Sequence, residues 1–203
     1  MNDQREFWNE RFGREGYFYG TNPNRYLASH IDALPPHQTV LFLGEGEGRN
    51  AVYALERGHT VTALDAAEIG LAKTAMLAQS KGLEVSLIHT DLEFWNPVQQ
   101  YDAIMCSFLH LTEPLRSEVF AKSLAYLNAG GVFVGEFFSI HQLPKNTGGP
   151  KDLDLLYTAD QLSSIVAVLP CEILELCEID TQLHEGTGHN GEASVVRLKV
   201  QKK

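Results

Sequence analysis

Short apolar runs and longer amphipathic segments alternate along the chain from residue 39 onward. The apolar runs predict strands at 40–43, 59–64, 85–88, 102–106 and 132–138. The segments between them predict helices at 48–57, 66–81 and 114–127, which are ended by glycines at 58, 82 and 130–131. Strands that alternate with helices of about ten or more residues indicate βαβ units and a mainly parallel sheet.

The two ends of the chain depart from this alternation. Residues 3–13 predict a short amphipathic helix, and the aromatic loop 17–20 follows it. After Ser139 a loop of about twenty residues precedes a helix at 159–169, and loops of that length are usually functional or disordered. Strands at 172–183 and 193–200, joined by loop 185–191, should pair antiparallel because no helix separates them. The pattern predicts a doubly wound, Rossmann-like α/β fold.

Length and composition fit a single domain. Of the 203 residues 44% are hydrophobic, which is enough for one core and too few for two large ones. We expect one domain over 1–203. It would comprise an N-terminal helix and lid-like segment (1–38), a cofactor-binding core (39–138), and a substrate-side loop, helix and hairpin (139–203).

The charge balance narrows the choice of partners. The chain has 16 basic and 26 acidic residues and no dense Lys/Arg block, which argues against nucleic acids and anionic membranes as partners. No apolar run approaches the roughly 20 residues of a membrane helix, and a signal peptide is not recognisable. We expect a cytoplasmic monomer or homodimer that acts on a small molecule. Cys106, Cys171 and Cys177 form no C-x-x-C pair and should be reduced thiols rather than disulfides or metal ligands.

A triple-glycine turn carries the main chemical signal. Gly44, Gly46 and Gly48 follow the apolar run 40–43 and open the predicted helix, so their main-chain N–H groups can approach a ligand closely. Two types of cofactor fit this turn. Gly46-x-Gly48-x-x-Ala51, with Asp65 at the end of the next strand, satisfies the dinucleotide fingerprint of an NAD-linked oxidoreductase.

The acidic residues of the turn favour a different cofactor. Glu45 and Glu47 lie inside the turn, and negative charge at a helix N-terminus opposes the binding of a pyrophosphate. A cationic ligand tolerates these carboxylates. S-adenosyl-L-methionine carries a sulfonium and an ammonium group, and it suits a carboxylate-lined glycine turn better than NAD does.

The turn and several later segments resemble a known family, the class I S-adenosylmethionine-dependent methyltransferases, and within it the tellurite-resistance and thiopurine-type branch. The resemblance covers nearly the whole chain and is carried by residues 43–53, 58–65, 91–92, 101–104 and 127–131. It implies a seven-stranded sheet, mainly parallel, with one antiparallel strand from the C-terminal hairpin. Phe42 stands where many members of the class carry an acidic residue two positions before the first glycine.

The resemblance also implies the cofactor contacts. Gly44, Glu45 and Gly46 would face the methionine and ribose of the cofactor. Asp65, with Ala66 beside it, would accept hydrogen bonds from the ribose diol, because a carboxylate at the C-terminal end of a strand faces the ligand crevice. The alternative for Asp65 is a helix N-cap.

The other expected cofactor contacts each have a structural alternative. Asp91 and Leu92 would flank the adenine, or Asp91 is only a turn residue. Arg49 and Asn50 would cap the methionine carboxylate, or they hold neighbouring loops together. Tyr19 would belong to a lid over the cofactor, or to an aromatic cluster on the surface.

The acceptor side is expected where the strand at 102–106 ends. Ser107 and Phe108 would form the floor of the methyl-transfer site, with Phe108 near the sulfonium by cation–π attraction or else in the core. His110 is either catalytic or a structural histidine. His184 matches by position a proposed base of the tellurite-resistance branch. With His189 and Glu185 it would orient or deprotonate the acceptor, or these are solvated loop residues.

A metal site is not expected, because the two histidines of His184-Glu185-x-x-x-His189 lie five residues apart and glycines interrupt the segment, unlike the H-E-x-x-H helix of zinc proteases. The expected reaction is methyl transfer from S-adenosyl-L-methionine to a small-molecule acceptor, such as a thiol or a chalcogen oxyanion like tellurite. The alternatives are an NAD(P)-dependent oxidoreductase and a non-catalytic S-adenosylmethionine-binding domain.

Overall fold

The computed structural model describes residues 2–203 and the side chains from residue 4 onward. It contains two compact units. The first runs up to Trp95 and also includes Glu185–Gly188, and the second comprises Asn96–His184 and His189–Lys203. The prediction of a single domain over 1–203 stays a prediction.

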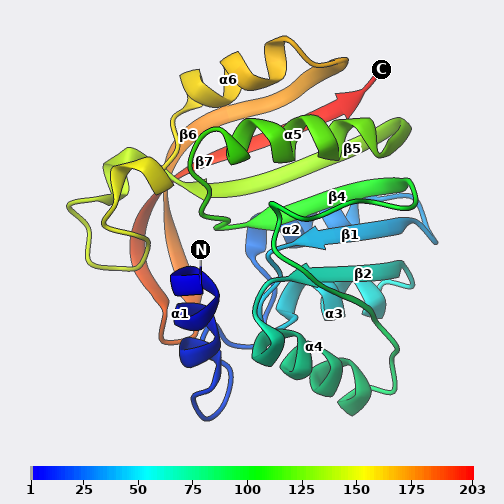
Figure 1. Cartoon of the computed structure of the whole chain (residues 1–203), viewed down its shortest axis with the longest axis vertical. Coiled ribbons are helices and arrows are strands. Elements are labelled where there is room, and N and C mark those ends of the chain that lie inside the picture. The colour runs from blue at the N-terminus through cyan, green and yellow to red at the C-terminus, as the bar shows by residue number, and fades with distance from the viewer. Residues whose placement is uncertain (1) are drawn as a thin grey trace. The chain divides into compact units, whose positions relative to one another are not determined.

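The first unit is built on three parallel strands, β1 (Thr39–Leu43), β2 (Thr60–Asp65) and β3 (Ser86–His89). Its helices are α1 (Asn2–Phe12), α2 (Arg25–Asp32), α3 (Arg49–Glu56) and α4 (Glu68–Ser80), and α1 lies beside α4 (Figure 1). Residues Val40 to Leu43 of β1 are completely buried. Burial on both faces explains why a strand of a parallel sheet reads as a continuous apolar run.

The second unit contains the other four strands, β4 (Tyr101–Ser107), β5 (Leu127–Phe138), β6 (Cys171–Glu185) and β7 (His189–Lys202). The last residue of β6, Glu185, belongs to the first unit. Its helices are α5 (Leu115–Ala125) and α6 (Ala159–Ala167), with short 3-10 turns η1 (Ile140–Gln142) and η2 (Leu153–Leu155). Strands β4 and β5 pair in parallel, whereas β7 runs antiparallel to β5. The seven strands have the order β3-β2-β1-β4-β5-β7-β6 in one sheet, which confirms the predicted Rossmann-like fold with an antiparallel strand from the C-terminal hairpin.

Two local predictions were wrong, and one helix was not predicted. Strand β5 begins at Leu127 and continues through Gly130 and Gly131, which were expected to end the preceding helix, and the pairing with β4 shifts register at this point. The turn of the C-terminal hairpin spans only Gly186–Gly188, because β6 and β7 both extend into the expected loop. Helix α2 was not predicted, although the side chain of Asn24 accepts a hydrogen bond from the N–H of Leu27 and caps it.

A buried arginine organises the loop after β5. The guanidinium of Arg116 on α5 donates to the backbone carbonyls of Leu111, Asp154 and Leu156, and lies 4.0 Å from the ring centroid of Tyr157. Arg116 is only 3% exposed. Its charge is therefore stabilised mainly by carbonyl dipoles and an aromatic face rather than by solvent.

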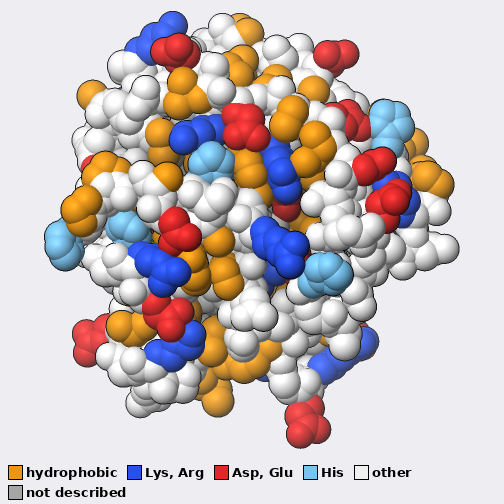
Figure 2. All heavy atoms as spheres, turned by 180° about the vertical axis from the view of Figure 1, so that it is seen from behind, with side chains coloured by type: hydrophobic (Ala, Val, Ile, Leu, Met, Phe, Trp, Pro, Cys, Tyr) orange, Lys and Arg blue, Asp and Glu red, His pale blue; other side chains and the backbone are white. Residues whose placement is uncertain are grey.

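Charged side chains of both signs are interspersed with apolar ones on the face shown in Figure 2. Within residues 2–203 no helix has the length and apolar character needed to span a membrane. The same described residues contain no group of three or more His, Cys, Asp and Glu side chains arranged to hold a metal ion.

Candidate cofactor site and active site

The glycine turn connects β1 to α3. Gly44, Gly46 and Gly48 all have positive φ angles, of 61°, 67° and 91°, which favour glycine. The last two are also held by packing. A Cβ on Gly46 would lie 3.0 Å from the Phe12 ring, and a Cβ on Gly48 would lie 2.7 Å from Oγ1 of Thr74. The turn therefore needs glycine both for its conformation and for its close contact with α1 and α4.

The carboxylate of Glu45 binds the N-terminus of α3. Its Oε1 accepts hydrogen bonds from the N–H groups of Asn50 and Ala51 at 2.8 and 2.7 Å. N–H groups of the first helical turn have no acceptor within the helix, and an anion binds favourably there. Burial raises the pKa of Glu45 to about 7, although the hydrogen bonds from Ala51 and Asn50 and the charge of Arg49 act in the opposite direction. Glu45 thus binds two of the helix N–H groups that a pyrophosphate at this helix N-terminus would use.

The second acidic residue of the turn, Glu47, holds the N-terminal loop. Its Oε2 accepts the N–H of Phe18 at 2.7 Å, and its Oε1 binds Nζ of Lys73 at 2.9 Å. Lys73 also donates to the carbonyls of Arg14 and Gly16. Glu47 is thus paired with a cation and fixes the aromatic loop to the glycine turn and α4.

Asp65 lies at the end of β2, as expected, and is 8% exposed. Its two oxygens accept the N–H groups of Gly46 and Ala67, both at 2.7 Å. Burial raises its pKa, while these hydrogen bonds oppose the increase. A carboxylate has room for about four hydrogen bonds, so Asp65 can accept further donors. Asp65 thus lies at a strand end, as expected, and binds the backbone just before α4; its ribose role stays a prediction.

Arg49 and Asn50 are both buried at the start of α3. Oδ1 of Asn50 accepts the N–H of Asn24 at 2.9 Å, so this side chain holds the segment before α2. Nη2 of Arg49 binds Oε2 of Glu185 at 2.9 Å, and both side chains are 7% exposed. Among the described residues, Nη1 of Arg49 is buried and has no hydrogen-bond partner.

Tyr19 belongs to an aromatic cluster of the first unit. Its hydroxyl accepts a hydrogen bond from Arg11 at 2.9 Å, and its ring lies edge-on to Phe12 and Phe18. Burial raises its pKa, and the charges of Arg11 and Arg49 oppose this increase. Tyr19 therefore lies near Arg49, and the aromatic loop is anchored next to the glycine turn.

The expected adenine contacts follow β3. Oδ1 of Asp91 accepts the N–H of Glu93 at 3.1 Å, which makes Asp91 a turn residue, and Leu92 is buried. The carbonyl of Ala66 lies 3.1 Å from Nε2 of His89. The adenine roles of Asp91 and Leu92, and the ribose role of Ala66, stay predictions.

In the second unit, three of the expected acceptor-side residues gather around one phenylalanine, Phe138. The Phe108 ring stacks on it at 4.4 Å between centroids, the His189 ring lies edge-on at 5.0 Å, and the His110 ring lies at 6.2 Å. Phe108 itself has a positive φ of 54°. A bulky residue in this conformation is strained, and such strain concentrates at functional sites.

The remaining expected residues differ in their exposure. His189 is 4% exposed and lies 4.5 Å from the Phe108 ring. His184 is exposed and follows the buried Leu183 in β6, so by alternation it points away from the core. Ser107 is half-buried at the end of β4. His189, rather than His184, is thus the histidine that the structure brings to Phe108.

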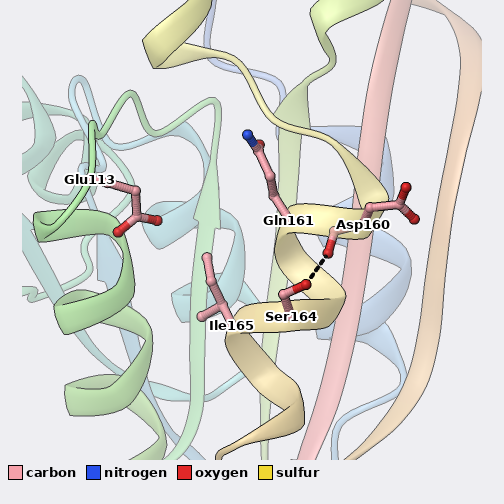
Figure 3. A pocket seen from close by; sticks show the side chains of 5 residues that line it. All are labelled: Glu113, Asp160, Gln161, Ser164 and Ile165. Carbon is pink, nitrogen blue, oxygen red and sulfur yellow. Dashed lines mark hydrogen bonds between the residues drawn. The ribbon is translucent and has the colours of Figure 1, made fainter.

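A cavity of about 370 Å³ lies in the second unit beside α6 (Figure 3). It is lined by Glu113, Asp160, Gln161, Ser164 and Ile165. Oε1 of Gln161 accepts from Thr158 and Arg116, and the Ser164 hydroxyl donates to the carbonyl of Asp160. The Gln161 oxygen and the Ser164 hydroxyl are thus already bound within the protein. None of the site residues predicted from the sequence lines this cavity.

Comparison with known families identifies the core of the chain. Residues 40–131 match the family model described as a methyltransferase domain. Over these residues the chain is similar to methyltransferase domains. The match begins in β1 and ends within β5, so it includes the glycine turn, Asp65, Asp91 and Phe108. Tyr19, His184, Glu185 and His189 lie outside the matched residues.

Solved structures with the same fold include several methyltransferases. TehB from Haemophilus influenzae is 20% identical, with a TM-score of 0.73 over 98% of this chain and 67% of TehB. Magnesium protoporphyrin IX methyltransferase from Synechocystis is 15% identical, with a TM-score of 0.74 over 100% of this chain and 99% of that protein. A protein that converts a disulfide bond into a thioacetal group during echinomycin biosynthesis is 18% identical, with a TM-score of 0.78 over 100% of this chain and 92% of that one. No curated protein sequence matches the chain.

The glycine turn depends on contacts that local sequence patterns do not reveal. Lys73, Asn24 and Glu185 bind the ends of the glycine turn from positions that are distant in the sequence. No spacing rule connects a helix lysine or a hairpin glutamate with a glycine turn. Only the glycine-rich composition of 185–191 marked the hairpin as unusual.

Proposed function

We propose that this chain transfers a methyl group from S-adenosyl-L-methionine to a small-molecule acceptor. The carboxylate of Glu45 on the N-terminus of α3 carries this proposal. Because the first N–H groups of the helix are already bound by an internal anion, the turn is unsuited to a pyrophosphate. A ligand with sulfonium and ammonium charges needs no such anion site, so the structure favours the methyltransferase cofactor over NAD.

The residues of the first unit fit this cofactor. Asp65 offers carboxylate lone pairs for a ribose diol, and Nη1 of Arg49 offers a buried donor for a carboxylate oxygen. Asp91 and Leu92 would flank the adenine, and Tyr19 would cover the ligand. The bound cofactor supplies a methyl group that is already activated by its sulfonium.

Activated methyl donors place modest demands on the protein. Positioning and exclusion of water can provide most of the rate, and a base is needed only when the acceptor binds in its protonated form. In this chain His189 is the best placed candidate base on the second unit, because it is buried against the strained Phe108. His110 and the exposed His184 are the other candidates, and they would act only on an acceptor that reaches them.

We propose a thiol or a chalcogen oxyanion as the acceptor. The resemblance to the tellurite-resistance branch supports an oxyanion such as tellurite, and the structural neighbour of echinomycin biosynthesis acts on sulfur. Both acceptor types are soft nucleophiles that are largely deprotonated or easily deprotonated near neutral pH. They therefore fit a site in which no described nucleophile and base form a catalytic pair.

Calorimetric titration with S-adenosyl-L-methionine and separately with NAD tests the cofactor. Binding of the first and not of the second is expected, and binding of NAD alone would contradict the proposal. Release of S-adenosylhomocysteine is then measured with tellurite, selenite and small thiols. Cofactor binding without turnover on any of these would favour the alternative of a non-catalytic binding domain.

A further inference from the structure

The tip of the C-terminal hairpin, Glu185–Gly188, belongs to the first unit together with the glycine turn. The N–H groups of Thr187 and Gly188 both donate to the carbonyl of Phe18, at 3.0 and 3.3 Å. The fit is close, because a Cβ on Gly186 would lie 2.4 Å from that carbonyl oxygen. The tip is thus seated on the aromatic loop that Glu47 fixes to the glycine turn.

Glu185 makes a charged contact at this tip. It is 7% exposed, and its two oxygens bind Nδ2 of Asn24 at 3.0 Å and Nη2 of Arg49 at 2.9 Å. Removing one partner of such a buried pair leaves an uncompensated charge, which is strongly unfavourable. The position of the tip and the orientation of the Arg49 guanidinium are therefore energetically linked.

The other side of this guanidinium is unsatisfied. Nη1 of Arg49 is buried and, among the described residues, unpartnered. A buried donor of this kind is costly unless a ligand acceptor satisfies it, and an anionic oxygen is the strongest partner for a guanidinium. The same guanidinium lies near Glu45 of the glycine turn, whose pKa its charge helps to lower against the effect of burial.

We propose that Arg49 binds the α-carboxylate of the cofactor through Nη1 and that Glu185, acting as a positioning residue, couples this contact to the ordering of the hairpin tip Glu185–Gly188. This inference rests on the proposed function. Binding of the cofactor carboxylate fixes the Arg49 guanidinium, and a fixed guanidinium favours the seated tip. By thermodynamic linkage, the seated tip strengthens binding of the carboxylate to the same extent.

The test compares S-adenosyl-L-methionine with its decarboxylated form, which keeps the sulfonium, ribose and adenine. We expect the wild-type protein to bind the intact cofactor at least about tenfold more tightly, as a charged hydrogen bond implies. In Arg49→Met and in the milder Arg49→Lys this ratio should fall to about twofold or less. Hydrogen exchange of the amides in 183–190 should slow with the intact cofactor and slow much less with the decarboxylated form.

Glu185→Gln separates the two parts of the proposal. This variant should still bind the intact cofactor, but exchange at the tip should no longer distinguish the two ligands. Glu56→Gln is the matched control, because it removes an exposed ion pair with Lys81 in the same unit, and it should behave as the wild type does. Thermal unfolding of each variant shows whether it is folded, and the comparison of ligands on the wild type needs no variant.

The outcomes separate this inference from the proposed function. Failure of the wild-type protein to bind S-adenosyl-L-methionine would refute both. If the wild type binds the cofactor but the ratio of affinities is the same in the Arg49 variants, or the tip exchanges equally with both ligands, the proposed function stands and the coupling is refuted.

Discussion

Glu45 should make the stability of the protein depend on pH in an unusual direction. Burial raises its pKa from 4.5 to about 7 in the folded protein. A raised carboxyl pKa means that the folded state holds the proton more tightly than the unfolded state. The stabilisation from this proton is fully present below pH 4.5 and is lost as the pH rises through about 7. Its full size, from the difference between these two pKa values, is about 3 kcal/mol.

The substitution Glu45→Gln removes the titration and keeps the shape of the side chain. The amide oxygen can accept both hydrogen bonds that Oε1 now takes from Asn50 and Ala51. We expect the wild type to gain stability relative to the variant by about 2 to 3 kcal/mol between pH 8 and pH 5, since most of the linkage lies in that interval. Urea unfolding of both proteins at pH 5, 6, 7 and 8 measures the difference.

Groups that titrate equally in both proteins cancel in this comparison, so only the difference between the two curves is informative. Glu56→Gln serves again as the control, because this carboxylate is on the surface, and its difference from the wild type should be nearly constant over the same interval. Parallel stability curves for wild type and Glu45→Gln would show that the buried carboxylate titrates normally, and the reasoning from burial would be refuted.

Two further substitutions test the packing of each unit by chemical denaturation. Gly186→Ala should destabilise the protein by at least about 2 kcal/mol more than Gly16→Ala. Both glycines have positive φ, but only at Gly186 would the added Cβ meet a backbone oxygen, that of Phe18. Equal losses of stability would contradict the observed seating of the hairpin tip. Arg116→Met should cost about 3 to 5 kcal/mol, because three backbone carbonyls would lose a buried cationic donor, and a loss no larger than that of the exposed Arg57→Met would contradict this role.

The fold could be predicted from the sequence because its signals are local. Apolar runs, amphipathic spacing and helix-ending glycines specify the strands and helices of a parallel sheet almost without tertiary information. The predictions failed where tertiary contacts override local preference. Gly130 and Gly131 lie inside a strand because a register shift opposite β4 accommodates them, and the hairpin loop is short because β6 and β7 pair almost to their ends.

The candidate site could be predicted only in part. The end of a strand followed by glycines located the turn, and the same rule placed Asp65 at the end of β2. The partners of the turn could not be found in this way, since Lys73 and Glu185 lie 26 and 136 residues from the residues that they bind. Contacts over such distances are products of the fold, and a single sequence contains no pattern that records them.

The acidic residues of the glycine turn show how a correct inference can rest on an incomplete reason. The sequence suggested that Glu45 and Glu47 repel a pyrophosphate by their charge. In the structure Glu47 is neutralised by Lys73 and faces the N-terminal loop, so it contributes little repulsion. Glu45 acts mainly by occupation, because its oxygen takes the helix N–H groups that a phosphate would need. Protonation of Glu45 would weaken its repulsion of a phosphate, but the side chain would still be bound to the helix N–H groups. The protein should therefore bind a dinucleotide poorly even at a pH well below 7.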